Sequence, residues 1–199
     1  AGDSSTLAAT LLEANSSVLE LYVSSGDGDR EHGIGQAGVA NLAMALADGL
    51  ELSELVLYGS LDDKSGPAVA DMLRGRSALT RLALYNSPLG GAGASELARA
   101  LSANTTLTEL DVRYTTVGAP GAAAIADALE TNLTLQRLNL RGSEVCRAAV
   151  AAPAAAAERT VDGARVLMRA LHVNTGLRSL HLCANELGDE GAAAVAEGL

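Results

Sequence analysis

The sequence predicts an α/β solenoid of about six stacked repeats, in which each repeat contains a short strand, a loop, a helix and a turn. The first observation is an L-x-x-L-x-L motif, with Val at some positions, that recurs along the chain. The second is composition: the 199 residues include no Phe, no Trp and only four Tyr. Leu, Val and Ala must therefore fill the core, and such uniform small side chains are typical of thin, repeating layers.

Each strand is predicted at the alternating part of the leucine motif, because a strand places every second residue on one face. The first members of the motif are Val18, Leu52, Leu79, Leu107, Leu135 and Leu177, and the steps between them are 34, 27, 28, 28 and 42 residues. The unit is therefore about 28 residues long. One unit cannot bury its own apolar face, whereas stacked units can.

Each helix is predicted to open at a glycine, which in four repeats lies nine residues after the last apolar strand residue. These glycines are Gly38, Gly66, Gly93, Gly121, Gly163 and Gly191, and they begin patterns such as GAAAIADAL. The patterns end at Asn15, Gly49, Gly75 or Arg76, Asn104, Asn132 and Asn174. Since Gly and Asn often follow a helix in the left-handed conformation, left-handed residues are predicted at these ends.

The repeats are assigned to residues 18–51, 52–78, 79–106, 107–134, 135–176 and 177–199 of a single domain (1–199), with 1–17 as the tail of a preceding repeat. We expect this domain to be a fragment of a longer array. The alanine-rich segment EVCRAAVAAPAAAAERT (144–160) does not separate two domains, because the repeat frame is the same before and after it. It is predicted to be a loop inserted between the strand and the helix of the fifth repeat. SGDGDREHG (25–33) is the corresponding insertion in the first repeat.

The segments LTELDVRYTTVGAPGAAAIADALETNLTLQRLNL and LRSLHLCANELGDEGAAAVAEGL resemble leucine-rich repeats of the ribonuclease-inhibitor type. The resemblance implies a horseshoe with parallel strands on the concave face and helices on the convex face. The family usually places Asn or Cys three residues after the last strand leucine, to bind loop backbone groups. Here these places hold Gly26, Ser60, Ser87, Thr115, Ser143 and Asn185. Ser and Thr form only part of those hydrogen bonds, so a weak ladder is expected.

Charge and motif content exclude several classes of function. A net charge of −10 and a pI near 4.7 argue against nucleic acid or an anionic membrane as a partner. The sequence has no phosphate-binding loop, H-E-x-x-H, C-x-x-C or G-x-S-x-G motif. It therefore predicts no enzyme, no catalytic residue, no cofactor and no metal site. Two cysteines form no disulfide framework and no secretory signal is visible, which favours a cytoplasmic protein.

The sequons at Asn15, Asn104 and Asn132 are interpreted structurally, because all three asparagines occupy the position that ends a helix. We therefore expect these side chains to serve the fold rather than to carry glycans.

The concave face is the predicted binding surface, because residues between the strand leucines point away from the core. Three rows of neighbouring residues result. The first is Glu20, Glu54, Arg81, Glu109, Arg137 and Ser179, whose charges alternate from Glu54 onward and predict a salt-bridge ladder. The second is Tyr22, Val56, Ala83, Asp111, Asn139 and His181. The third is Ser24, Tyr58, Tyr85, Arg113, Arg141 and Cys183.

Tyr and Arg are enriched at binding hot spots, and this face gathers both. The predicted partner-binding residues are Tyr22, Tyr58, Tyr85, Asp111, Arg113, Tyr114, Arg141 and His181. Arg113 and Arg141 are predicted neighbours that repel each other unless a carboxylate or another anion joins them. The expected partner is therefore a protein with an acidic segment.

The predicted function is a non-catalytic protein-interaction scaffold, acting as a subunit of a larger intracellular assembly. One alternative is a regulator of a small GTPase, because Ran GTPase-activating proteins have a similar repeat type. Another is the recognition segment of an innate-immune-type receptor or a bacterial effector. A cytoskeletal or ciliary assembly also suits the composition.

Overall fold

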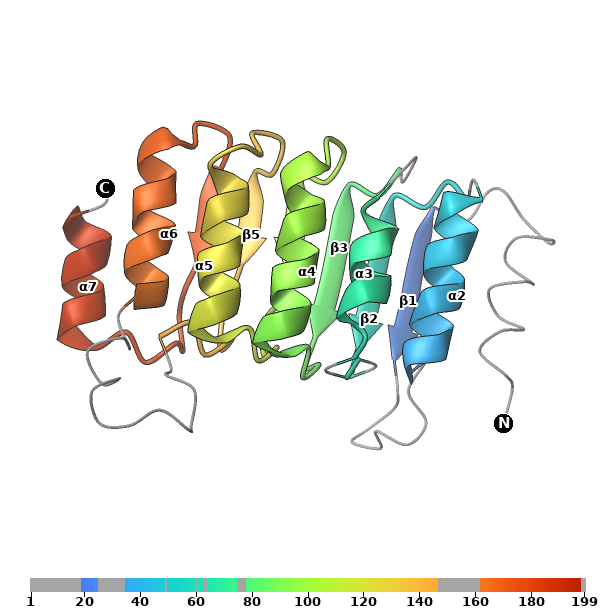
Figure 1. Ribbon diagram of the computed structural model, residues 1–199, viewed down its shortest axis with the longest axis horizontal. Coiled ribbons are helices and arrows are strands. Elements are labelled where there is room, and N and C mark those ends of the chain that lie inside the picture. Colours follow the sequence, from blue (N-terminus) through green and yellow to red (C-terminus); the bar gives the residue numbers. More distant parts are fainter. Residues whose placement is uncertain are drawn as a thin grey trace.

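The structure is a computed structural model that describes residues 19–24, 35–48, 50–59, 61–62, 64–74, 78–146 and 162–197. Strands and helices alternate along these parts of the chain (Figure 1). The strands are β1 (Glu20–Ser24), β2 (Glu54–Tyr58), β3 (Arg81–Tyr85), β4 (Glu109–Asp111), β5 (Arg137–Asn139) and β6 (Ser179–His181). The helices are α2 (Gly35–Ala47), α3 (Gly66–Met72), α4 (Gly90–Ala103), α5 (Gly118–Leu129), α6 (Asp162–Val173) and α7 (Gly188–Glu197).

The strands form one parallel sheet in chain order, β1-β2-β3-β4-β5-β6. The helices lie in a single layer against one face of this sheet (Figure 1). The predicted α/β solenoid, with parallel strands in one layer and helices in the other, is confirmed. Neighbouring strands lie about 4.8 Å apart, whereas packed helices need about 8–10 Å. A stack of such units therefore curves with the sheet on its inner, concave side.

Equivalent leucines of successive strands stack into layers between the sheet and the helices. Leu55, Leu82, Leu110 and Leu138 pair in register and are at most 1% exposed. Full burial of a leucine side chain contributes roughly 1.5–3 kcal/mol, so each layer is a substantial part of the core. The equivalent Leu180 of β6 is only partly buried.

The long insertion falls between β5 and α6. β5 ends at Asn139 and α6 begins at Asp162. The register continues past the insertion, since Leu138 pairs with Leu180 as Leu110 pairs with Leu138. Residues 147–161 of this insertion, and all of the earlier insertion at 25–33, lie outside the described residues.

The prediction that each helix opens at its repeat glycine is wrong for most helices. α2, α4, α5 and α7 begin three residues earlier, and α6 one residue earlier. The glycine instead lies where neighbouring atoms come too close to leave room for a Cβ atom. A Cβ on Gly66 would lie 2.5 Å from the Cα of Gly93, and a Cβ on Gly93 would lie 2.9 Å from the side chain of Leu89. Glycine is required there for packing within the first helical turn.

The prediction of left-handed residues at the helix ends is wrong at Asn104, Asn132 and Asn174, whereas Asn15, Gly49, Gly75 and Arg76 lie outside the described residues. Asn104 is extended, with φ −80° and ψ 134°, and neither Asn132 nor Asn174 has a positive φ. Five positive φ values lie two residues after the last apolar residue of the strand motif instead, at Gly59, Asn86, Tyr114, Gly142 and Ala184. The other positive φ values in the described residues are at Gly90, Gly118, Glu144, Glu186 and Gly188.

The asparagines at the helix ends form a buried hydrogen-bonded column, which we call the asparagine ladder (Asn104, Asn132 and Asn174). Asn132 Nδ2 donates to the carbonyls of Leu101 at 2.6 Å and Asn104 at 2.9 Å. Asn174 Nδ2 donates to the carbonyls of Leu129 at 2.6 Å and Asn132 at 2.8 Å. Each Oδ1 accepts two backbone N–H groups of the loop that enters the next strand.

A second column follows the strands at Ser87, Thr115, Ser143 and Asn185, all at most 2% exposed. As expected, a serine side chain at this position forms fewer hydrogen bonds than the asparagine does. The hydroxyl of Ser87 donates to one carbonyl, that of Tyr85. Asn185 Nδ2 donates to Leu140 and Leu182, and its Oδ1 accepts the N–H groups of Ser143 and Val145. Gly26 and Ser60 lie outside the described residues.

We predict that Asn132→Ala lowers the free energy of unfolding by about 2–4 kcal/mol, because buried carbonyl and N–H groups lose their partners. Urea denaturation measures this loss. Ser102→Ala, an exposed change on α4, is the control and should stay within about 0.5 kcal/mol of the wild type. Equal stability of the two variants would contradict a structural role for the asparagine ladder.

Candidate functional site

The candidate site is the face of the sheet that points away from the helices, which we call the sheet face. Strand pairing places the three predicted rows as neighbours. Glu54 pairs with Arg81, Ala83 with Asp111, and Tyr58 with Tyr85. Beyond the paired residues, backbone hydrogen bonds from Asn86 to Arg113 and from Tyr114 to Arg141 continue the third row. This arrangement aligns side chains from six separate repeats on one surface.

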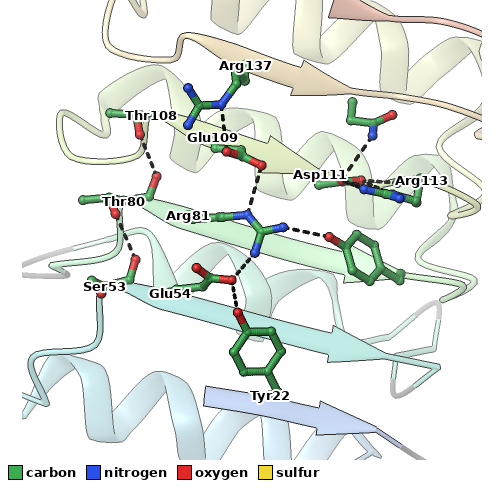
Figure 2. Close-up of polar contacts among 12 residues, drawn as sticks. Tyr22, Ser53, Glu54, Thr80, Arg81, Thr108, Glu109, Asp111, Arg113 and Arg137 are labelled. Atoms are coloured by element: carbon green, nitrogen blue, oxygen red, sulfur yellow. Dashed lines mark hydrogen bonds and ion pairs between the residues drawn. The ribbon is translucent and has the colours of Figure 1, made fainter. Parts of the chain in front are cut away.

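Four residues of the first row and Tyr22 of the second row form a continuous polar network, the sheet-face ladder (Tyr22, Glu54, Arg81, Glu109 and Arg137; Figure 2). Tyr22 donates its hydroxyl to Glu54 at 2.5 Å, and Arg81 bridges Glu54 and Glu109. Arg137 Nε lies 2.8 Å from the second carboxylate oxygen of Glu109. The predicted alternation of charge along this row is therefore an actual chain of ion pairs.

The ladder perturbs the ionisation of its central residues. Partial burial acts to raise the pKa of Glu109, but hydrogen bonds from Arg81 and Arg137 outweigh it and hold the pKa below its ordinary value. Burial opposes the charge of Arg81 as well, yet its bond to Glu109 and the nearby acidic groups raise its pKa. Both groups are thus charged across the neutral range.

The middle row differs from the prediction, because its central members do not reach solvent. Val56, Ala83 and Asp111 are 6%, 0% and 2% exposed. Arg81 donates from Nη2 to the hydroxyl of Tyr85 at 3.0 Å, so the two outer rows join above the small Ala83. The middle row is therefore the floor of the sheet face, and the long side chains on either side cover it.

Tyr58 and Tyr85 of the third row share the sheet face with Tyr22 of the second row and with Tyr114. The exposed fractions of Tyr22, Tyr58 and Tyr114 are 61%, 44% and 48%. Tyr85 is half-buried, because the guanidinium of Arg113 stacks 4.6 Å from its ring centroid. Burial raises the pKa of the Tyr85 hydroxyl. Three tyrosines of the face thus remain open to solvent, while Tyr85 is held in place.

Asp111 anchors Arg113 instead of reaching solvent itself. Its carboxylate accepts Arg113 Nη2 at 2.5 Å and Nε at 3.1 Å, and also the Asn139 side chain at 3.1 Å. The hydrogen bonds to Asp111 raise the pKa of Arg113. The predicted repulsion between Arg113 and Arg141 is therefore reduced by an internal carboxylate, which contacts Arg113.

Arg141 and His181 are exposed at the carboxyl-terminal half of the face. The guanidinium of Arg141 lies 5.9 Å from the ring centroid of Tyr114. His181, the register neighbour of Asn139, lines a hollow of about 160 Å³ together with Asp111, Arg113 and Arg137. Arg137 thus lies beside the Asp111–Arg113 pair in this hollow, whereas Arg141 lies beside Tyr114.

The backbone of Tyr114 is left-handed, which was not predicted from the sequence. Its φ is +56°, a conformation that bulky residues rarely adopt. Its ring packs on Gly142, where a Cβ would lie only 2.5 Å from the ring. Comparison of the repeats offered a signal, because Gly59, Asn86 and Gly142 occupy the same place and suit this conformation.

The described parts of the chain contain no cluster of three or more His, Cys, Asp or Glu side chains placed to hold a metal ion. Cys146 is buried and Cys183 is exposed, and both are free thiols. Among the described helices, none is long and apolar enough to span a membrane.

Comparisons with known proteins agree with this architecture. A family model described as Leucine Rich repeat matches residues 103–126 and 173–196. No curated protein sequence matches the chain. Among solved structures, the Caenorhabditis elegans tropomodulin C-terminal domain is similar at 15% identity, with a TM-score of 0.56, 85% of this chain and 94% of that chain covered. Leiomodin-1 Actin-Binding Site 2 is similar at 17% identity, with a TM-score of 0.50 and coverages of 96% and 86%. At these identities, the likeness establishes the fold.

We predict that Glu109→Gln lowers the free energy of unfolding at pH 7 by about 1 kcal/mol or less, because the ion pairs are partly solvated. The folded-state pKa of Glu109 is depressed, so its contribution is present above the unfolded pKa of about 4.3 and disappears as pH falls through the lower folded value. Urea titrations from pH 7 to pH 2 measure the difference between wild type and variant.

Glu130→Gln, an exposed change at the end of α5, is the control and should show no such loss at pH 7. A difference between wild type and Glu109→Gln that persists unchanged at the lowest pH would contradict the ion-pair explanation.

Proposed function

We propose that this leucine-rich-repeat protein of the ribonuclease-inhibitor type is a non-catalytic scaffold that binds a protein partner through its sheet face. The observation that supports the proposal most directly is the exposure of tyrosine and arginine side chains from successive strands on one surface. Tyr and Arg are over-represented at interface hot spots, since they combine a large contact area with hydrogen-bonding groups.

Preorganisation also supports a binding role for this face. The sheet-face ladder and the Asp111–Arg113 pair hold long side chains in defined positions. A partner then loses less conformational entropy when it docks than it would against freely rotating side chains. In this proposal the protein acts in the cytoplasm as a subunit of a larger assembly.

We predict that Tyr58→Ala/Arg141→Glu abolishes capture of specific partners, with at least a tenfold loss of recovered protein. Both residues are exposed, and the change leaves the sheet-face ladder and the Asp111–Arg113 pair intact. The measurement is affinity purification from the native source, with quantitative mass spectrometry.

Met44→Ala/Arg165→Glu is the matched control, because it also truncates one large exposed side chain to Ala and reverses the charge of one exposed arginine, on α2 and α6. Circular dichroism verifies that both variants fold. Partners that are lost equally with both variants, or retained by both, would place the contact away from the sheet face.

Actin is the candidate partner that the comparisons suggest, because the similar leiomodin structure is named as an actin-binding site. We predict that the wild-type protein co-sediments with actin filaments and that Tyr58→Ala/Arg141→Glu remains in the supernatant. The Met44→Ala/Arg165→Glu control should pellet like the wild type. Absence of the wild type from the pellet would exclude filamentous actin and leave the search for partners to the affinity purification.

A further inference from the structure

Two neighbouring repeats present almost the same short motif on the sheet face, but among the described residues the arginine of one motif is paired with a carboxylate and the arginine of the other is not. The fourth repeat has Asp111 and Arg113, and the fifth has Asn139 and Arg141 at the equivalent places. Asp111 and Asn139 are register partners in β4 and β5. The two repeats therefore show the effect of replacing a carboxylate with an amide at equivalent backbone positions.

In the fourth repeat the arginine of the motif is bound by the aspartate of the same motif. Asp111, which is 2% exposed, receives two nitrogens of the Arg113 guanidinium and the Arg113 backbone N–H. The other face of that guanidinium stacks on Tyr85. The charge of Arg113 is therefore compensated within its own chain, although 40% of the Arg113 side chain remains exposed.

In the fifth repeat the arginine of the motif has no carboxylate partner within the motif. Asn139 Nδ2 donates to Asp111 at 3.1 Å, and its Oδ1 accepts the backbone N–H of Arg141. Neither contact neutralises the Arg141 side chain. Among the described residues no ion pair joins Arg141 to a carboxylate, in contrast to Arg81, Arg113 and Arg137.

The amide at position 139 has a clear physical reason. A second aspartate there would place two carboxylates about 3 Å apart, and such a pair cannot readily remain doubly ionised. Asn139 instead donates a hydrogen bond to the Asp111 carboxylate. The group of Asp111, Arg113, Asn139 and Arg141 consequently carries one uncompensated positive charge, located on the exposed Arg141.

Tyr114 completes the environment of this charge. Its ring is 48% exposed, lies 5.9 Å from the Arg141 guanidinium and rests on Gly142. Its left-handed backbone is the conformation that the repeats share at this turn, here adopted by a bulky residue. An aromatic wall beside a cation holds the planar guanidinium and leaves its other donors available.

We propose that Arg141 binds a carboxylate side chain, an Asp or Glu of a partner's peptide segment, with Tyr114 as the apolar wall of that contact. A guanidinium matches a carboxylate with two parallel hydrogen bonds. One uncompensated charge suits a single carboxylate better than a doubly charged phosphate. This inference rests on the proposed function, because it identifies the anion contact within the sheet-face interface.

The experiment is a peptide selection followed by a double-mutant cycle. A phage-displayed library of short random peptides is selected on the wild-type protein, and peptides that Tyr58→Ala weakens are kept as sheet-face binders. Each acidic residue of a selected peptide is then changed to its amide, and affinities for wild type and Arg141→Ala are measured by calorimetry. A phosphoserine version of the same peptide compares the two anions.

We expect loss of one carboxylate to weaken binding to the wild type about tenfold or more and to have almost no effect on Arg141→Ala. We also expect the phosphoserine peptide to bind no better than the acidic one. Sheet-face peptides without this coupling, or with a clear preference for phosphate, would overturn the inference and leave the proposed function standing. Absence of any Tyr58-dependent peptide would overturn both.

Stability measurements separate binding from folding. Arg141→Ala should leave the urea midpoint unchanged, whereas Arg113→Ala should lower it, because Asp111 then lies buried without its arginine. Tyr114→Asn, which copies Asn86 at the equivalent turn, should weaken peptide binding without lowering the midpoint. A lower midpoint for Arg141→Ala, or unchanged affinity for Tyr114→Asn, would count against the proposal.

Discussion

The bond from Asn132 Nδ2 to the carbonyl of Asn104, repeated from Asn174 to Asn132, locks each repeat to the one before it. The same side chains bind the N–H groups that lead into the next strand, so they set where that strand begins. A parallel sheet shifted by one residue would turn its leucines outward. The buried asparagines and the stacked leucines therefore hold the register on which every row of the sheet face depends.

This register converts a one-dimensional pattern into a surface. Residues about 28 positions apart become direct neighbours, and ion pairs such as Arg81–Glu109 form between repeats. Long side chains from the outer rows then meet above small floor residues such as Ala83. Ion pairs therefore cross the sheet face from β2 to β5, and among the described residues none reaches β6.

The same repetition makes differences between repeats informative. Equivalent positions share one backbone geometry, so a change from Asp111 to Asn139 alters charge and little else. Most of the arginines in the described part of the sheet face form ion pairs with carboxylates of the same chain. Arg141 forms none with the described residues, so its charge is available to a partner. The strained Tyr114 stands beside Arg141.

The sequence by itself determined the repeat frame, the strands, the parallel α/β layers and the rows of the sheet face, because period-two leucines and a recurring unit admit few other arrangements. It did not reveal that Asp111 is buried or that Tyr114 is left-handed. Those properties depend on contacts between repeats, namely the covering of the floor by Arg81 and Tyr85 and the packing of a ring on Gly142. Only tertiary structure decides which charges are satisfied, since ionic partners are chosen by distance in space.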